Sequence, residues 1–218
     1  MQILVVGATG QTGTHIVKEL LKRNIKVTAL VRNLEKAKEL FPSGVDFVLG
    51  DVTQPDTIAE AISRCNILIC ATGATPSFNF TEPYQVDCQG TKNLVNLAKE
   101  NNIEHFVIVS SLCVSKLFHP LNLFWLVLFW KKQAETYLQQ SGLTYTIVRP
   151  GGLKNEDNTE QIVMSSSDTL FEGSIPRQKV AQVCVEALFN DDAKNKIVEI
   201  VTKPDQPAQT WQNLFASV

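Results

Sequence analysis

The sequence lacks the excess of basic residues that nucleic-acid-binding proteins carry. Its 218 residues contain 20 Lys and Arg against 22 Asp and Glu, which gives a formal net charge of −2. A protein that binds along a nucleic acid needs surplus cations to neutralise the phosphates. We therefore expect no nucleic-acid partner.

Cysteine and histidine are scarce as well. The five cysteines and three histidines form no CxxC pair and no metal-ligand spacing, so we expect neither a metal site nor a disulfide framework. An odd number of cysteines, several of them in apolar runs, is typical of buried free thiols in a reducing compartment. No charged-then-apolar leader precedes the first predicted strand. These features predict a cytoplasmic protein, or a stromal one in a plastid-bearing organism.

No apolar run is long enough to span a membrane. The run from Leu121 to Trp130 has one polar residue in ten, whereas a spanning helix needs roughly 17 apolar residues or more. Three roles suit it: the start of a buried helix, a wall of an acceptor pocket, or a peripheral contact with a membrane or another protein. The Lys131 and Lys132 that follow would support a membrane contact. The sequence does not choose among these roles and sets no oligomeric state.

What the sequence does contain is a regular alternation of short apolar runs and helical segments. Hydrophobic residues make up 44% and charged residues 19%, the composition of a folded globular protein. The alternation predicts an α/β fold of the Rossmann type, with a doubly wound parallel sheet. No linker divides the chain, so we expect one domain over residues 1–218. From about residue 150 onward it should form a small lobe over the carboxyl edge of the sheet.

The individual elements follow from these patterns. Strands are predicted at residues 3–6, 27–31, 47–49, 67–71, 106–109, 145–148 and 197–201. Helices are predicted at residues 12–23, 55–64, 89–101, 131–140 and 178–189.

A glycine-rich loop follows the first predicted strand and opens the first predicted helix. Residues 7–13 read Gly-Ala-Thr-Gly-Gln-Thr-Gly. In a dinucleotide site such glycines permit a tight turn, a close approach of the backbone to the pyrophosphate, and close packing of helix on sheet. The helix N-terminus then offers unpaired N–H groups to the phosphates. This order of strand, loop and helix predicts a dinucleotide site; the alternative is a tight turn without a ligand.

The end of the second strand indicates which dinucleotide is bound. NAD sites place an Asp or Glu about 20 residues beyond the glycines, whereas this chain has Arg32. A guanidinium binds a 2′-phosphate and stacks on adenine, while an acid would repel that phosphate. We predict NADP(H), with Asp51 near the adenine amino group and Val52 against the ring; a surface arginine and a helix cap are the alternatives. The central ribose and phosphates should meet Ala71, Thr72 and Gly73.

Five stretches of the chain resemble a known family. They are GATGQTG (7–13), VTALVRN (27–33), GDVTQ (50–54), VSS (109–111) and SGLTYTIVRPGGL (141–153). Together they look like the atypical short-chain dehydrogenase/reductase superfamily, in the NAD(P)H-binding branch that holds NmrA-like regulators and biliverdin-IXβ reductase (flavin reductase). The resemblance covers nearly the whole chain and is greatest to plant and cyanobacterial members.

The resemblance implies roles for individual residues. The phosphate loop would consist of Gly7, Thr9, Gly10, Gln11, Thr12 and Gly13. Ser110 and Ser111 would stand at the catalytic serine position, beside the nicotinamide. Lys131 would take the catalytic lysine position and hydrogen bond the nicotinamide ribose. Pro150 and Gly151 would cover the nicotinamide face.

The chain departs from this family at the catalytic tyrosine. Short-chain dehydrogenases place a Tyr four residues before the lysine, and its proton completes the reduction of a carbonyl; here that residue is Val127. A conjugated acceptor such as FMN or a bilin takes hydride into a delocalised system and a proton from solvent. The resemblance thus implies an NADPH-dependent flavin or biliverdin reductase. The alternative is a non-catalytic NADP(H)-binding redox sensor or assembly factor that docks to a partner or membrane.

Aromatic side chains after the fourth strand suit a flat acceptor. Phe78 and Phe80 lie in a loop at the carboxyl edge of the sheet, where they would stack on a ring system or anchor the loop. We assign the acceptor site to these two residues together with Ser111 and Leu112.

Overall fold

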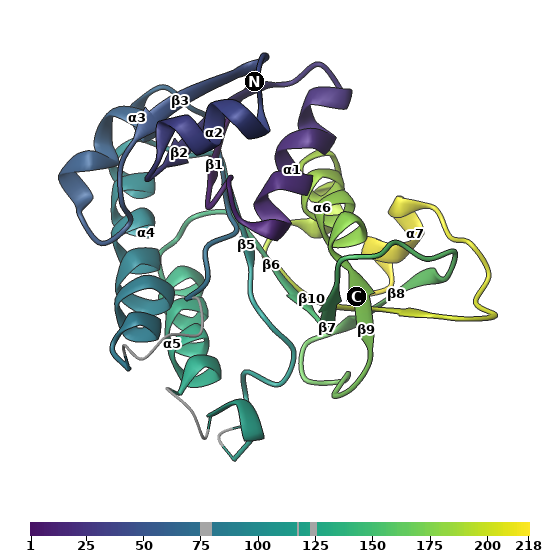
Figure 1. Ribbon diagram of the computed structural model, residues 1–218. Helices are drawn as coiled ribbons and strands as arrows, with labels where there is room; N and C mark the ends of the chain where they lie inside the picture. The colour runs from purple at the N-terminus through teal and green to yellow at the C-terminus, as the bar shows by residue number, and fades with distance from the viewer. Residues whose placement is uncertain (75–79, 117, 123–125) are drawn as a thin grey trace.

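The chain folds into three layers, with helices on both faces of an eight-stranded sheet (Figure 1). The computed structural model describes residues 1–74, 80–116, 118–122 and 126–218. The strands of the large sheet are β1 (Gln2–Val6), β2 (Lys26–Val31), β3 (Val45–Leu49), β4 (Ile67–Cys70), β5 (His105–Val109), β6 (Tyr145–Pro150), β8 (Gln161–Ser166) and β10 (Lys196–Lys203).

The strand order is β3-β2-β1-β4-β5-β6-β10-β8. All neighbouring strands are parallel except β8, which runs antiparallel to β10. The chain first moves outward from β1 to β3 and then returns to β4 on the other side of β1. Its connections therefore diverge between β1 and β4, and ligands of such sheets bind at this switch point, outside the carboxyl ends of the strands.

Each face of the sheet has its own set of helices. One face is covered by α1 (Gln11–Lys22), α2 (Leu34–Leu40), α6 (Arg177–Glu186) and α7 (Trp211–Ala216). The other is covered by α3 (Ala59–Ser63), α4 (Thr91–Glu100) and α5 (Val127–Gln139). A π-helical segment, Tyr84–Gly90, runs directly into α4.

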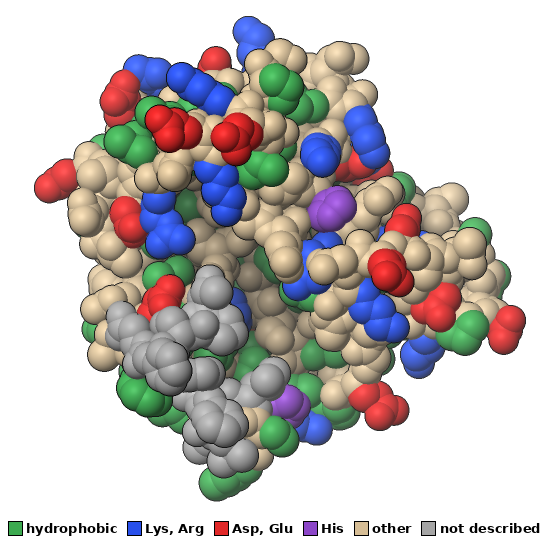
Figure 2. All heavy atoms as spheres, in the orientation of Figure 1, with side chains coloured by type: hydrophobic (Ala, Val, Ile, Leu, Met, Phe, Trp, Pro, Cys, Tyr) green, Lys and Arg blue, Asp and Glu red, His purple; other side chains and the backbone are tan. Residues whose placement is uncertain are grey.

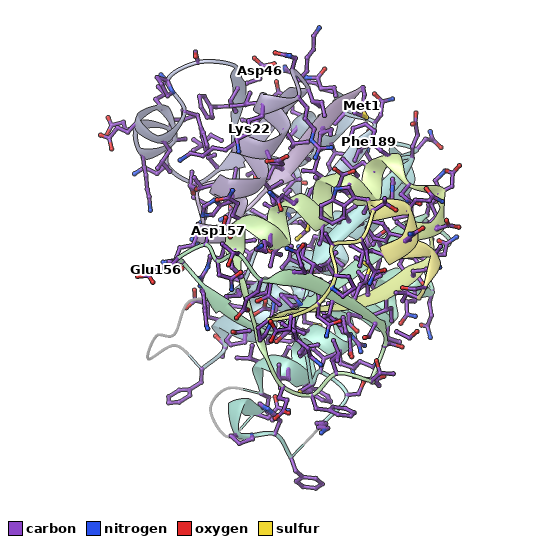
Figure 3. The ribbon with its side chains drawn as sticks, turned by 90° about the vertical axis from the view of Figure 1, so that its right-hand side faces the viewer. Met1, Lys22, Asp46, Glu156, Asp157 and Phe189 are labelled. Atoms are coloured by element: carbon purple, nitrogen blue, oxygen red, sulfur yellow. The ribbon has the colours of Figure 1, made fainter. Side chains whose placement is uncertain are left out.

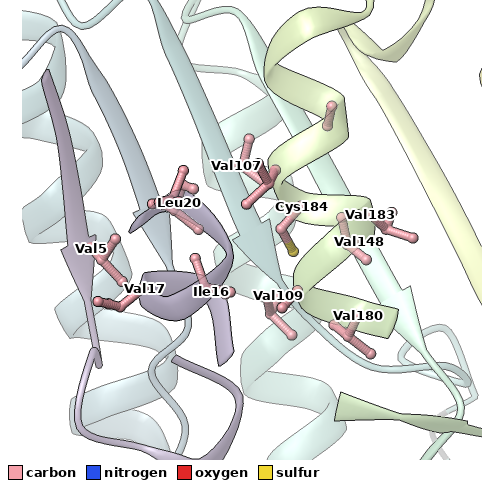
Figure 4. Close-up of a cluster of buried hydrophobic side chains, with 14 of the residues drawn as sticks. Val5, Ile16, Val17, Leu20, Val107, Val109, Val148, Val180, Val183 and Cys184 are labelled. Atoms are coloured by element: carbon pink, nitrogen blue, oxygen red, sulfur yellow. The ribbon is translucent and has the colours of Figure 1, made fainter. Parts of the chain in front are cut away.

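The strands are buried on both faces, so their side chains alternate between two apolar cores. Ile3 and Val5 face the core under α1, whereas Leu4 and Val6 face the core under α3 and α4. Figure 4 shows the first core, in which α1 and α6 direct their side chains onto the strands, among them Ile16, Leu20, Val180 and Cys184.

Residues 150–218, for which we expected a small lobe, take part in two sheets. β10 and β8 extend the main sheet, and α6 packs against α1. β7 (Gly152–Lys154) and β9 (Ser174–Pro176) pair in a separate two-stranded parallel sheet. In Figure 3, Glu156 and Asp157, which follow β7, stand well away from the amino edge of the main sheet, marked by Met1 and Phe189.

The predicted strands are all confirmed, with ends that shift by one or two residues. The helix predicted at 55–64 is split, because Pro55–Thr57 is a 3-10 turn and α3 begins only at Ala59. The helix predicted from residue 131 begins at Val127, since apolar residues form its first turn. The sequence patterns did not predict α2, α7, β7, β8 or β9.

Candidate functional site

A cleft of about 240 Å³ opens at the carboxyl edge of the sheet, beside the switch point between β1 and β4. Figure 2 shows the molecule hollowed near the centre of this face. The structure brings together along its walls the predicted cofactor residues Gly7, Thr9, Gly10, Arg32, Asp51, Val52, Ala71, Thr72 and Gly73.

Two glycines of the loop at 7–13 occupy positions that fit no other residue. Gly7 has a φ of +79°, and a Cβ there would lie 2.7 Å from the Ala71 carbonyl oxygen. A Cβ on Gly13 would overlap the carbonyl oxygen of Gly7. The loop therefore passes close to the end of β4 and folds against the first turn of α1, so backbone forms this part of the cleft wall.

The start of α1 directs backbone N–H groups toward the loop. Its N-cap residue is Gly10, no described side chain caps these groups, and the first turn holds no acidic residue. Of the other predicted loop residues, Gln11 is exposed and Thr12 is buried in this turn. The positive end of the helix dipole is therefore available to an anion.

Two cations line the cleft where β2 ends. Arg32 follows β2 directly, and Lys36 lies in the first turn of α2. That helix begins here because the Asn33 side chain accepts a hydrogen bond from the Lys36 N–H at 3.0 Å. Neither cation forms an ion pair with a residue that the structure describes. The sequence analysis missed Lys36, although a lysine one turn behind a capping Asn is a readable signal.

Asp51 and Val52 form the adjoining wall. Asp51 Oδ1 accepts hydrogen bonds from the Thr53 N–H at 2.8 Å and the Thr53 hydroxyl at 2.7 Å. This turn fixes the carboxylate, and the helix-cap alternative does not apply because the N-cap of the next turn is Gln54. Val52 is buried against the π-helical segment, where a Cβ on Gly90 would lie 2.6 Å from Val52 Cγ2.

The backbone beyond β4 runs along the cleft. The Ala71 N–H donates to the Val6 carbonyl at 2.9 Å, which continues the pairing of β1 with β4 to Ala71, directly before Thr72 and Gly73. Phe78, predicted to contact an acceptor, lies outside the described residues. Phe80 is exposed.

A smaller cavity of about 10 Å³ adjoins the cleft at Thr72 and holds an ion pair. Lys131 Nζ donates to Asp87 Oδ1 at 2.7 Å, and both side chains are largely buried. Burial lowers the pKa of Lys131, but the Asp87 carboxylate outweighs this effect and holds the pKa above its usual range. Asp87 Oδ2 also accepts the Ala74 N–H at 3.2 Å. The sequence analysis missed Asp87, because it began this helix at residue 89.

Ser110 and Ser111 follow β5 in different environments. Ser110 lines the small cavity and is 7% exposed, and its hydroxyl has no hydrogen-bond partner among the described residues. Ser111 is partly exposed. Leu112, expected at the acceptor site, is buried in an apolar cluster with Leu128 and Val201. Ser110 thus keeps hydrogen-bonding capacity for a bound group next to Lys131.

Pro150 and Gly151 end β6 and pack against the C-terminal part of the chain. The Gly151 N–H donates to the Ile200 carbonyl at 2.9 Å, and a Cβ on Gly151 would lie 2.7 Å from the Gly173 carbonyl oxygen. The predicted cover of the nicotinamide is therefore a backbone surface held by β10 and the turn before β9.

Arg149 of β6 stabilises this part of the wall through ion pairs in the protein interior. Its fully buried guanidinium binds Glu135 at 2.7 and 3.0 Å, Glu199 at 3.1 Å and Asp168 at 3.0 Å. Burial lowers the pKa of Arg149, but Glu135 and the other carboxylates raise it well above its usual range. Glu199 also accepts the backbone N–H groups of residues 168–170. We call these four side chains the Arg149 cluster.

The apolar segment 121–130 lies only partly within the described residues, which leave out 123–125. Residues from Val127 to Trp130 form the first turn of α5, and Leu128 is buried. The rings of Trp130 and Tyr84 lie 4.9 Å apart. The second half of the segment therefore starts a helix in which Leu128 is buried, while Val127, Phe129 and Trp130 are partly exposed.

Apolar side chains within and just before this segment face solvent. Phe118 is 98% exposed, and Leu126, which precedes α5, is exposed too. Among the described residues, we find no helix with both the length and the apolar character that crossing a bilayer requires.

These features fit a nicotinamide dinucleotide that carries an extra phosphate. The glycine positions leave room for a ligand against the backbone, and the start of α1 suits a pyrophosphate. Arg32 and Lys36 add two positive charges at the other end of the cleft. The chain therefore has groups of the right chemistry for each charged part of such a cofactor.

Comparison with known proteins points to a nicotinamide cofactor. A family model described as NAD(P)H-binding matches residues 7–191. A chloroplastic protein of Arabidopsis thaliana is 46% identical over 230 residues, which cover 100% of this chain and 82% of that protein. Sanguinarine reductase of Eschscholzia californica is 31% identical and matches over 100% of this chain and 96% of its own. The chloroplastic protein TIC 62 of Pisum sativum is 35% identical over 99% of this chain, which spans 46% of TIC 62.

Solved structures share the fold. A putative NAD-dependent epimerase/dehydratase from Bacillus halodurans superimposes with a TM-score of 0.87 at 27% identity, over 100% of both chains. ChuY, an anaerobillin reductase from Escherichia coli O157:H7, gives a TM-score of 0.80 at 23% identity and covers 95% of this chain and 100% of its own. The second likeness establishes the fold alone.

Proposed function

Because the chain belongs to the NAD(P)H-binding family, we propose that it is an oxidoreductase that prefers NADPH to NADH and reduces a flat, conjugated acceptor such as FMN or a bilin. The observation that carries the cofactor preference is the pair Arg32 and Lys36, which line the cleft without an ion-pair partner among the described residues. A 2′-phosphate is the group that two such cations recognise.

The residues of the chain bind and orient this cofactor. When bound, NADPH supplies a hydride, and the protein contributes alignment. The loop at Gly7 and the first turn of α1 receive the pyrophosphate, and Asp51 with Val52 borders the adenine. At the opposite end, Lys131 and Ser111 orient the nicotinamide ribose.

Val127 supports the proposed class of acceptor. This residue begins α5 one turn before Lys131, so the chain has no tyrosine at the position where short-chain dehydrogenases keep a proton donor. A conjugated ring system tolerates this because its proton can come from solvent. The relative sanguinarine reductase, which matches over nearly its whole length, supports a reductase. Phe80 and Ser111 are the described residues proposed to contact the acceptor.

The first experiment measures the loss of NADPH absorbance with the purified protein and FMN, and separately with biliverdin, beside an NADH control. Saturable consumption that prefers NADPH supports the reductase and ranks the two acceptors. Rates equal to those without protein for both acceptors would remove the proposed catalytic role while leaving cofactor binding to be measured directly.

Arg32→Ala tests the cofactor preference. Loss of a charge-assisted contact with the 2′-phosphate should weaken NADPH binding about tenfold or more, and far more than it weakens NADH binding. Lys38→Ala is the matched control, because Lys38 lies on the same helix as Lys36 but does not line the cleft. Equal losses for NADPH and NADH would contradict the assignment of Arg32.

A second candidate function is a non-catalytic NADP(H) sensor or assembly factor that docks through residues 121–130. The fully solvent-facing Phe118, together with exposed Leu126, favours a contact surface beside the cleft. The chloroplastic relatives support a stromal location as part of either proposal. Flotation with vesicles of anionic lipid, with and without NADP+, tests the docking; protein that stays wholly unbound in both states argues against a membrane contact.

A further inference from the structure

The π-helical segment Tyr84–Gly90 brings a carboxylate into the interior beside the cleft. Within this segment Asp87 is 3% exposed, and its neighbours Cys88 and Gly90 are buried too. Both carboxylate oxygens of Asp87 are occupied, one by Lys131 Nζ at 2.7 Å and the other by the Ala74 N–H at 3.2 Å. A single side chain thus joins α5 to the backbone that leaves β4.

Among the residues that the structure describes, Asp87 is the one available counter-ion of Lys131. The titratable groups that face the ammonium are Asp87, the Cys70 thiol at the end of β4, and Glu135 one turn along α5. Glu135 is engaged by Arg149, and burial raises the pKa of Cys70, which keeps that thiol neutral. The charge of Lys131 therefore depends on Asp87.

The ion pair borders the cofactor cleft. A Cβ on Gly73, which lines the cleft, would lie 3.9 Å from both Asp87 Oδ1 and Lys131 Nζ. Thr72 lines both the cleft and the small cavity that holds the pair. On the other side of this cavity, the buried Ser110 hydroxyl has no partner among the described residues. A polar group of a ligand that enters here would meet a fixed ammonium and a hydroxyl with spare capacity.

We infer that Asp87 is a positioning residue for the cofactor: its carboxylate holds the Lys131 ammonium beside Gly73, where the ammonium meets the ribose at the nicotinamide end. The inference rests on the cofactor site of the proposed function but not on any acceptor. According to this inference, cofactor binding requires the negative charge of Asp87, because an amide of the same shape would leave the buried Lys131 ammonium without a counter-ion.

The test measures the affinity for NADP+ between pH 7 and pH 9, which requires no turnover. Asp87→Asn should bind NADP+ about tenfold more weakly at pH 7. Its affinity should fall further as pH rises, because without the carboxylate burial lowers the pKa of Lys131 toward the measured range. The wild-type affinity should stay constant over the same interval.

Two further variants separate positioning from a purely structural role. Lys131→Met should weaken binding with no pH dependence, and the double variant should equal Lys131→Met, because Asp87 acts only through Lys131. Glu60→Gln, at an exposed ion pair of α3, is the control and should match the wild type. If Asp87→Asn is unfolded at the assay temperature, Asp87→Glu replaces it; that variant keeps the charge and should keep a flat pH profile.

Each outcome decides the inference. Losses of affinity that add in the double variant, a pH profile of Asp87→Asn parallel to the wild type, or a wild-type affinity for Asp87→Asn would each overturn it. A wild-type protein that does not bind NADP+ would overturn both this inference and the proposed function. Binding with the expected variant pattern but no reduction of any acceptor would support the inference and remove only the reductase.

Discussion

Helix α5 contributes to two buried ionic sites, one turn apart, that are completed in different ways. Lys131 pairs with one carboxylate at the edge of the cleft, next to the Ser110 hydroxyl, which has no partner in the part of the chain that the structure describes. Glu135 belongs to the Arg149 cluster, where one guanidinium contacts three carboxylates. Backbone N–H groups donate further hydrogen bonds to the Glu199 carboxylate of this cluster.

This difference distinguishes an ionic site that stabilises the fold from one that can bind a ligand. A buried ionic network whose partners are all within the protein fixes the relative placement of the elements that it joins. A buried pair that borders a cavity and a free hydroxyl keeps capacity for a ligand. On helix α5, therefore, Glu135 stabilises the wall beside the cleft, whereas Lys131 keeps capacity for a ligand in the cleft.

The largest expected effect comes from breaking the Arg149 cluster. Arg149→Met removes the cation that pairs with the buried Glu135 and Glu199 and leaves Glu135 only Lys132 at 4.0 Å, so the free energy of unfolding should fall by about 3 to 5 kcal/mol. Urea denaturation measures this, with Arg64→Met as control; Arg64 pairs with Glu60 on the surface, and its loss should cost less than about 1 kcal/mol. Similar losses of unfolding free energy for the two variants would show that the cluster stabilises the fold no more than a surface ion pair does.

His105 extends the comparison to a buried group that has no carboxylate partner among the described residues. The side chain is 4% exposed and contacts the Thr146 hydroxyl at 2.9 Å, and burial, with Lys194 nearby, lowers its pKa to about 4. Because the folded pKa lies below the unfolded value, its contribution is present above about pH 6.5 and is lost as pH falls toward 4. Wild type should lose about 3 kcal/mol more than His105→Gln between pH 7 and pH 4.

Acid and urea denaturation at several pH values give this difference. Both proteins share every carboxylate, so the acid titration of the Asp and Glu residues cancels in the comparison. Parallel stability curves for wild type and His105→Gln would refute the assignment of a neutral buried imidazole.

The smallest effect is expected at Asp168, the one solvent-facing member of the Arg149 cluster. Its side chain is 45% exposed; burial raises its pKa, but the Ser115 hydroxyl and Arg149 outweigh this and lower it. Asp168→Asn should cost less than about 1 kcal/mol at pH 7. Because the folded pKa is depressed, that cost should vanish as pH falls below the usual range of an Asp. A loss as large as that of Arg149→Met would mean that the cluster depends on its exposed member.

The elements that sequence patterns predict are those whose evidence is local. β1, the loop at Gly7 and α1 are contiguous, and their apolar runs and glycines stand in one stretch of the chain. β8 was missed because it is an antiparallel edge strand of mixed polarity that pairs only with β10. α2 is seven residues long and depends on one capping side chain, Asn33.

The missed functional residues depend on contacts between distant parts of the chain. Asp87 and Lys131 are separated by 44 positions, and Arg149 and Glu199 by 50. No spacing rule links such pairs, and whether Asp87 points inward depends on a π-helical turn that leaves no readable signature in the residues. Arg32, in contrast, was predictable because its place at the end of β2 follows from the order of the elements.

The π-helical segment also makes the position of Asp87 depend on the number of residues between Tyr84 and Gly90. A helix with an average of 3.6 residues per turn rotates by about 100° for each residue added or removed. Deleting one residue between Tyr84 and Gly90 would let the segment continue α4 as ordinary α-helix. Asp87 would then rotate away from Lys131, even though neither side chain had been changed. A one-residue deletion here would therefore break the ion pair although Asp87 and Lys131 both remain in the chain.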